Sequence, residues 1–152
     1  MALLPPKLAA PLVDLVQGRP AARRALATAR TGGRGEAPRP AYASLVHRLA
    51  GDCESVLDVG TGLMRSLAKS PCQVRIGLDA HRPYLEQREV AGAVPVCASA
   101  LDLERLFVPG AVDLVQLIDV LEHFSVEDAD SLLDQARTVA TRRVVLFTPR
   151  GE

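Results

Sequence analysis

Two carboxylates and two glycines stand where they can form a ligand site. The stretch VLDVGTGLM, residues 56–64, is an apolar segment that carries Asp58 and then turns at Gly60 and Gly62. Glycines at such a turn allow a tight bend and let backbone N–H groups approach a ligand with no Cβ in the way. Asp79 closes the next apolar segment, nineteen residues after Gly60. A carboxylate in that place can accept hydrogen bonds from both hydroxyls of a ribose, so the pattern predicts a nucleoside-containing ligand.

Two features of the turn distinguish a dinucleotide from an adenosyl sulfonium ligand. The dinucleotide fingerprint has a third glycine three residues after the second, where this chain has Arg65. It also has no need of a carboxylate two residues before the first glycine, where this chain has Asp58. A carboxylate there faces an ammonium group favourably and a pyrophosphate unfavourably. The residues therefore favour S-adenosylmethionine over a nicotinamide dinucleotide.

The same residues also have structural interpretations. Asp58 can cap the turn that follows it, and Asp79 can cap the helix that Pro83 opens. Because both occur together with the glycines, we favour ligand binding. Glu122 and His123 are adjacent and suggest a general base or a metal pair. Neighbouring helical side chains point in different directions and two residues make no metal site, so we expect packing at a helix start, no metal and no identifiable general base.

Strand-like and helix-like segments alternate along the chain and position these residues. The strand-like segments are mostly continuous in hydrophobicity, as expected where helices cover both faces of a sheet. The alternation predicts an α/β fold with a Rossmann-like, doubly wound parallel sheet of about five strands. The expected strands are Ser55–Val59, Val74–Leu78, Val94–Cys97, Asp113–Ile118 and Arg143–Thr148, and the expected helices are Ala41–Leu49, Leu63–Lys69, Pro83–Val90 and Ser125–Ala140.

Four motifs resemble those of one enzyme family. Between residues 54 and 151 the chain reads VLDVGTG, RIGLDAHRPYLEQ, FVPGAVDLVQLIDVLEHF and RRVVLFTPRG in this order. The series is similar to the class I S-adenosylmethionine-dependent methyltransferases, and most similar to a bacterial subgroup with a DVLEH turn and a terminal FTP strand. The resemblance implies the strand order 3-2-1-4-5. It also implies a truncated version of the fold, because the family's last two strands have no counterpart in the sequence.

The resemblance also implies a role for each cofactor-binding residue. Gly60 and Gly62 would lie against the methionine part of the cofactor, and Asp58 would hold its amine. Asp79 would accept from the ribose, and the residues after the second and third strands would lie beside the adenine. The expected cofactor-binding set is Asp58, Gly60, Thr61, Gly62, Asp79, Ala80, His81, Ser99, Ala100 and Asp119. The family's turn often has a further glycine where this chain has Met64.

Charge and composition divide the chain into two parts. Residues 1–40 carry seven basic and two acidic residues and many prolines and glycines, whereas residues 41–152 have a net charge of −5. We expect a basic N-terminal arm over 1–40, more often solvated than bound to nucleic acid, and a methyltransferase-like domain over 41–152. The three cysteines show no CxxC spacing, and no apolar stretch approaches the ~18 residues of a membrane span. These features predict a cytoplasmic protein.

The sequence leaves two functions open. The first is methyl transfer from S-adenosylmethionine to a small-molecule or glycan-like acceptor, by a fragment or a half of a complete enzyme. The alternative is a noncatalytic methyltransferase-like module that acts through a partner protein. The apolar segment over 143–148 would leave an unpaired strand edge, a known site of intermolecular pairing. We therefore expect homo- or hetero-oligomers through this strand and no methyl transfer by the isolated chain.

Overall fold

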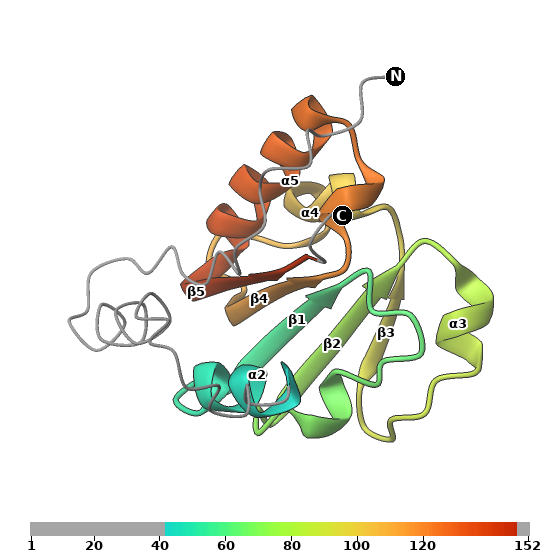
Figure 1. Cartoon of the computed structure of the whole chain (residues 1–152), viewed down its shortest axis with the longest axis vertical. Helices are drawn as coiled ribbons and strands as arrows, with labels where there is room; N and C mark the ends of the chain where they lie inside the picture. Colours follow the sequence, from blue (N-terminus) through green and yellow to red (C-terminus); the bar gives the residue numbers. More distant parts are fainter. Residues whose placement is uncertain (1–41, 149–152) are drawn as a thin grey trace, which may run out of the picture.

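The structure is a computed structural model that describes residues 42–148. Strands and helices alternate along this part of the chain (Figure 1). The strands are β1 (Ser55–Val59), β2 (Val74–Asp79), β3 (Val94–Cys97), β4 (Val112–Ile118) and β5 (Ala140–Phe147). The helices are α2 (Tyr42–Ala50), α3 (Arg82–Glu86), α4 (Leu103–Leu106) and α5 (Val126–Val139), with 3₁₀ turns η1 (Leu67–Lys69), η2 (Ala100–Asp102) and η3 (Leu121–His123). The expected arm over 1–40 lies outside the described residues.

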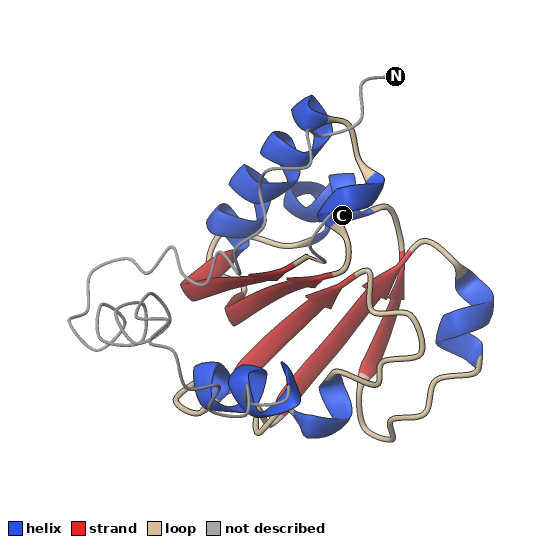
Figure 2. Cartoon of the chain, in the orientation of Figure 1, coloured by secondary structure: helices blue, strands red, loops and turns tan. Residues whose placement is uncertain are grey.

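The five strands form one sheet in the order β3-β2-β1-β4-β5. Every neighbouring pair is parallel, which confirms the expected topology. Figure 2 shows the arrowheads of the strands along one edge of the sheet. The turns that follow β1, β2, β3 and β4 therefore meet at this carboxyl-terminal edge, where ligands of open α/β sheets bind.

Helices cover both faces of the sheet, as the continuous apolar strands indicated. On one face Leu57 of β1 packs in a cluster with Leu132 of α5. On the other face Val56 of β1 packs in a cluster with Leu67 of η1. Consecutive strand residues point to opposite faces, so β1 contributes to both clusters. Figure 1 shows α4 and α5 on one side of the sheet and α2 on the other.

The longest helix, α5, begins and ends as its sequence predicts. The Ser125 hydroxyl accepts a hydrogen bond from the backbone N–H of Asp128 at 3.1 Å and caps the first turn. One stripe of the helix faces the sheet and consists of Ala129, Leu132, Ala136 and Val139, all buried. This spacing is the apolar face expected of a helix that covers a sheet.

Two expected helices differ in the structure. The prediction of a helix over Leu63–Lys69 is wrong, because only the 3₁₀ turn η1 forms there. The first turn of the expected helix is broken at Met64, which has a φ of +61°, a value outside the right-handed helical region. The helix expected over Pro83–Val90 ends at Glu86. The chain then turns back, and the Glu89 N–H donates to the Leu63 carbonyl oxygen at 3.2 Å.

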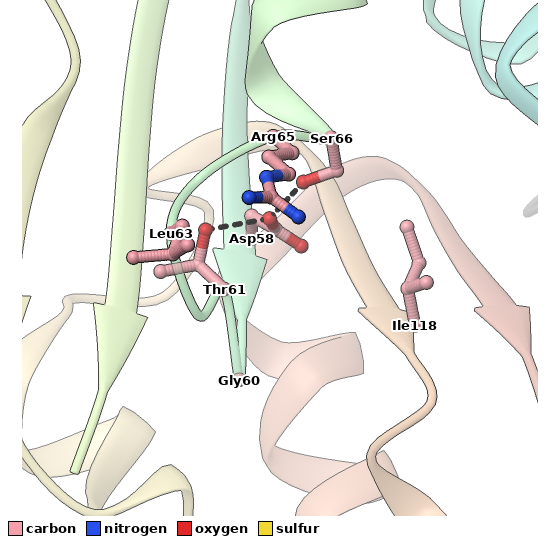
Figure 3. A pocket seen from close by; sticks show the side chains of 7 residues that line it. All are labelled: Asp58, Gly60, Thr61, Leu63, Arg65, Ser66 and Ile118. Atoms are coloured by element: carbon pink, nitrogen blue, oxygen red, sulfur yellow. Dashed lines mark hydrogen bonds between the residues drawn. The ribbon is translucent and has the colours of Figure 1, made fainter. Parts of the chain in front are cut away.

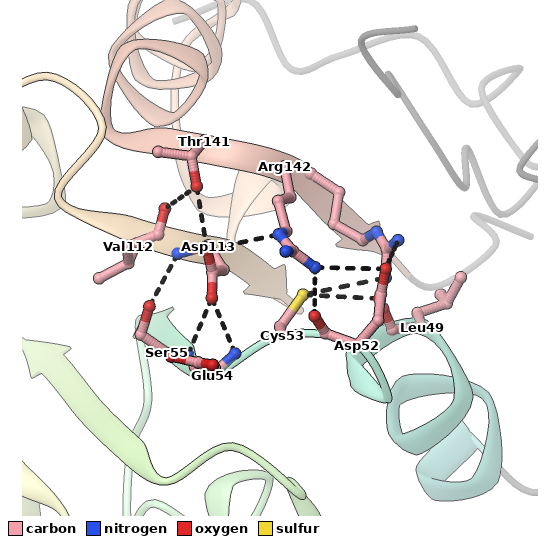
Figure 4. A network of polar contacts seen from close by, with 10 residues as sticks. Leu49, Asp52, Cys53, Glu54, Ser55, Val112, Asp113, Thr141 and Arg142 are labelled. Carbon is pink, nitrogen blue, oxygen red and sulfur yellow. Dashed lines mark hydrogen bonds and ion pairs between the residues drawn. The ribbon is translucent and has the colours of Figure 1, made fainter. Parts of the chain in front are cut away.

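Ion pairs join the turn after α2 to the start of β5 at the amino-terminal edge of the sheet (Figure 4). The Arg143 guanidinium group donates to both carboxylate oxygens of Asp52 and to the Leu49 carbonyl oxygen near the end of α2. Arg142 lies beside it, with Nη1 at 3.4 Å from Asp52 Oδ2. The hydrogen bond from Arg143 holds the pKa of Asp52 below its usual range. These contacts fix the position of α2 against the sheet.

A second carboxylate links three strands at the same edge. Asp113 Oδ2 accepts from the backbone N–H groups of Glu54 at 2.7 Å and Ser55 at 3.3 Å. Its other oxygen accepts from the Thr141 hydroxyl at 3.1 Å. Partial burial acts to raise the pKa of Asp113, but these hydrogen bonds outweigh it and the pKa is lowered. The carboxylate of β4 thus holds the starts of β1 and β5 together.

Replacing Asp52 with Asn tests this edge. The folded-state pKa of Asp52 is lowered, so its stabilising effect is present above its ordinary pKa of 3.8 and is lost as the pH falls through the folded value. We expect Asp52→Asn to be less stable than the wild type at pH 7, and the difference to shrink below about pH 4. Urea unfolding between pH 3 and pH 7 measures both. Parallel pH profiles for the two proteins would mean that the ion pair with Arg143 does not stabilise the fold.

Candidate functional site

The glycine turn after β1 is held against β2 and open on its outer side. The N–H groups of Gly60 and Thr61 both donate to the Leu78 carbonyl oxygen, at 2.8 and 3.1 Å. Gly60 and Gly62 have φ values of +69° and +53°, which favour glycine. A Cβ on Gly60 would lie 2.5 Å from Val120 Cγ2, whereas a Cβ on Gly62 would meet no atom of residues 42–148 within 4 Å. Packing therefore requires the first glycine, and open space lies in front of the second.

Met64 occupies the place where a further glycine was expected, and it keeps a glycine-like backbone. Its φ is +61°, and its side chain is fully buried. A Cβ on Gly77 of β2 would lie 2.8 Å from Met64 Cε and 2.9 Å from Thr61 Cγ2. Positive φ at a non-glycine residue costs about 1–3 kcal/mol, and burying a Met side chain contributes about 1.5–3 kcal/mol. Packing against Gly77 thus offsets the strain of the turn.

Asp58 is the buried carboxylate beneath this turn. Asp58 is the second-last residue of β1, and it is 2% exposed. The Thr61 hydroxyl donates to Asp58 Oδ2 at 2.7 Å, and the Ser66 hydroxyl donates to the same oxygen (Figure 3). Burial raises the pKa of the Asp58 carboxyl group, and these two hydrogen bonds act against the rise without cancelling it. The site therefore holds a carboxylate whose charge is poorly compensated by the protein.

Gln116 is a polar residue of the same region that the sequence analysis missed. It lies opposite Asp58 in the β1–β4 ladder and is completely buried. Its amide acts to lower the pKa of Asp58, yet within the described residues neither Nε2 nor Oε1 has a hydrogen-bond partner of good geometry. A buried polar group without a partner costs about 1–3 kcal/mol. The signal in the sequence was a single amide inside the apolar strand VDLVQLI.

Asp79 connects the glycine turn to the turn before α3. Its Oδ2 accepts from the Gly62 N–H at 2.8 Å, and its Oδ1 accepts from the His81 N–H at 2.7 Å. Each carboxylate oxygen has a second lone pair, so these bonds leave acceptor capacity for a ligand. The exposed His81 ring stands edge-on to the Tyr84 ring, with centroids 4.4 Å apart. Asp79 does not cap α3, whose N-cap is His81 and has no side-chain cap bond, but it holds the turn before this helix and retains the capacity to bind a ligand.

The remaining expected residues lie at the ends of the neighbouring strands. The Ser99 hydroxyl follows β3 and accepts from the Leu101 N–H at 3.2 Å, so it caps η2, which begins at Ala100. Asp119 follows β4 and is exposed, with a φ of +53° and its N–H bonded to the Phe147 carbonyl oxygen at 2.8 Å. Among the described residues, hydrogen bonds connect Asp58 with Thr61 and Asp79 with Gly62 and His81. Ser99, Ala100 and Asp119 share the edge without a hydrogen bond to the turn.

A pocket of about 250 Å³ opens beside the turn. Its lining combines a buried carboxylate, two hydroxyl groups, a guanidinium group and apolar side chains (Figure 3). The lining residues are Asp58, Gly60, Thr61, Leu63, Arg65, Ser66 and Ile118. In residues 42–148, no cluster of three or more His, Cys, Asp or Glu side chains is arranged to hold a metal ion. Within the same residues, no helix combines the length and hydrophobicity that spanning a bilayer requires.

Comparison with known proteins identifies the fold. No family model and no curated protein matches the chain. Solved structures do, with 16% to 21% identity in three cases. They are an O-methyltransferase family protein from Burkholderia thailandensis (21% identity, TM-score 0.56), a SAM-dependent methyltransferase from Archaeoglobus fulgidus (21%, 0.51) and SAM-bound CalS10, an amino pentose methyltransferase from Micromonospora echinaspora (16%, 0.59). The described part of the chain therefore has the Rossmann-like fold of the class I methyltransferases.

The matches cover more of this chain than of the solved structures. They include 68%, 64% and 70% of this chain, in the order given above. They include 36%, 46% and 48% of the Burkholderia, Archaeoglobus and Micromonospora chains. The chain thus spans about half or less of the length of these methyltransferases.

Replacing Asp58 with Asn tests whether the buried carboxylate lowers the stability of the fold. The Asn carbonyl oxygen can accept from Thr61 and Ser66 in place of Oδ2. The folded-state pKa of Asp58 is raised. The contribution of its protonated carboxyl group to the free energy of unfolding is therefore fully present below the ordinary pKa of 3.8 and is lost as the pH rises through the folded value. We expect Asp58→Asn to be more stable than the wild type at pH 8 and equally stable near pH 4. Urea unfolding at the two pH values measures this difference.

Asp113→Asn is the matched control. The pKa of Asp113 is lowered, so the same substitution there removes stability at pH 8. If Asp58→Asn also lost stability at pH 8, the Asp58 carboxylate would be a structural cap and its burial would carry no cost.

Proposed function

We propose that the chain binds S-adenosylmethionine at the carboxyl-terminal edge of its sheet and serves methyl transfer. The observation that carries the proposal is the arrangement of Asp79 and Gly62. A carboxylate at the end of β2 accepts a hydrogen bond from the N–H of the glycine turn at 2.8 Å, and no atom of the described residues lies within 4 Å of where a Gly62 Cβ would stand. The fold shared with methyltransferases of known structure supports the same ligand.

The charges at the turn suit the two ends of the cofactor. Asp58 lines the pocket with a buried, undercompensated carboxylate, and an ammonium group beside it would favour the ionised form. Asp79 would accept from the ribose hydroxyls with its remaining lone pairs. A pyrophosphate would instead be repelled by the carboxylates of Asp58 and Asp79. The turn also lacks the third glycine of the dinucleotide fingerprint. These groups fit the adenosyl cofactor better than a dinucleotide.

The remaining residues of the edge extend the proposed site toward the adenine and the acceptor. Ala80 and His81 would lie beside the adenine, where the Tyr84 ring restricts the His81 ring. Ser99 and Ala100 would face the adenine amino group from the end of β3. Asp119, exposed after β4, would lie near the reactive methyl group.

The chemistry of the transfer belongs mainly to the cofactor, which supplies an electrophilic methyl group when bound. The protein would contribute by holding donor and acceptor in line and by excluding water. We propose a small-molecule or glycan-like nucleophile as the acceptor. An acceptor of this kind is named for CalS10, which acts on an amino pentose.

Calorimetry with the full chain tests the proposed ligand before an acceptor is known. We expect S-adenosylmethionine and S-adenosylhomocysteine each to bind at one site per chain and NAD⁺ to give no heat above dilution. Binding of NAD⁺ alone would contradict the proposal. Methyl transfer by the same samples would exclude the alternative, a module that binds the cofactor and acts through a partner, whereas we expect the isolated chain to transfer none.

Replacing Asp79 with Ala should weaken S-adenosylhomocysteine binding by about 10- to 100-fold. Hydrogen bonds to a charged group contribute about 1.5–3 kcal/mol, which corresponds to this range. Asp134→Ala, on the exposed surface of α5, is the matched control and should bind as the wild type does. Because Asp79 also accepts from Gly62 and His81, thermal unfolding must show that the variant is folded. Equal affinity in a folded Asp79→Ala variant would make Asp79 a structural residue only.

A further inference from the structure

Arg65 places a guanidinium group in the lining of the pocket that Asp58 also lines. Within the described residues its ion-pair partner is Glu89, with Nε at 2.9 Å from Oε2 and Nη2 at 2.7 Å from Oε1. The Glu89 N–H is in turn bonded to the Leu63 carbonyl oxygen of the turn. Glu89 thus holds one edge of the guanidinium group in a fixed orientation.

The other edge of the same group has donors to spare. A guanidinium group has five N–H donors, and Glu89 accepts from two of them, the N–H of Nε and one N–H of Nη2. Among the contacts of the described residues, Nη1 has no partner, and the Arg65 side chain is 70% exposed. The Nη1–Nη2 edge therefore has the fork geometry that binds a carboxylate through two parallel hydrogen bonds.

The lining of the pocket thus contains opposite charges. Asp58 is a buried carboxylate that suits an ammonium group, and Arg65 is a cation that suits a carboxylate. An α-amino acid carries an ammonium group and a carboxylate group on one carbon and therefore matches both residues. The apolar side chains of Leu63 and Ile118 in the same lining suit the methylene groups that follow it.

We propose that Arg65 binds the carboxylate of the methionine part of the cofactor and makes the site selective for ligands with an intact α-amino acid group. The inference rests on the proposed function, because it assigns one further residue to that site. Glu89 acts as a positioning residue for Arg65. An adenosyl thioether without the carboxylate loses the contact with Arg65 and keeps all the others.

Two ligands that differ by one group test the proposal. S-adenosylhomocysteine has the amine and the carboxylate, and S-adenosyl-3-thiopropylamine has the amine alone. The wild-type chain should prefer the first, and Arg65→Gln should bind it about tenfold more weakly. The affinity of the variant for the amine ligand should stay within about twofold of the wild-type value, so the preference disappears. Arg65→Lys keeps the charge without the fork and should lose less than Arg65→Gln.

Arg137→Gln is the matched control, since Arg137 forms a similar exposed ion pair on α5, with Nη1 at 2.6 Å from Asp134. It should leave both affinities unchanged. Exposed ion pairs contribute little to stability, so the Arg65 variants should unfold at the wild-type temperature. An equal loss of affinity for both ligands, or no loss for either, would overturn the role of Arg65. Failure of the wild type to bind either ligand would overturn the proposed function together with it.

Discussion

The hydrogen bond from the Gly62 N–H to the Asp79 carboxylate is the contact on which the carboxyl-terminal edge of the sheet depends. It joins the turn after β1 to the end of β2, and the same carboxylate fixes the turn before α3 through His81. The Leu78 carbonyl oxygen adds two further bonds from this turn. Two loops are thereby held in place by Asp79 and its neighbour Leu78, while no described residue fills the space in front of Gly62.

Beneath this turn the fold retains polar groups that do not serve its stability. Asp58 is buried with a raised pKa, and within residues 42–148 the buried Gln116 next to it has no hydrogen-bond partner of good geometry. Met64 adds a backbone conformation that is unfavourable for a residue with a side chain. Such groups concentrate at functional sites, where a ligand supplies the missing interactions. At the opposite edge, by contrast, Asp52 and Asp113 are well paired, and both pKa values are lowered.

The sequence predicted the sheet better than it predicted the turn. Strands covered on both faces are continuous in hydrophobicity, and this pattern predicted β1 to β5. Their order in the sheet came from the family resemblance. The helix expected at Leu63 failed because Met64 has a positive φ, which no propensity reveals. Gln116 and Gly77 were missed, although an amide in an apolar strand and a glycine within a strand are signals of a site and of close packing. The cofactor-binding roles of all the expected residues, from Asp58 to Asp119, stay predictions.

A nuclear magnetic resonance titration of the ¹⁵N-labelled chain with S-adenosylhomocysteine tests most directly whether this edge is the binding site. We expect saturable shifts of the amide signals of Gly62, His81 and Asp119, which follow three different strands of the sheet. The signals of Cys53 and Thr141, at the opposite edge, should stay in place. Shifts confined to the amino-terminal edge, or an unchanged spectrum at millimolar ligand, would contradict the assignment of the carboxyl-terminal edge as a cofactor site.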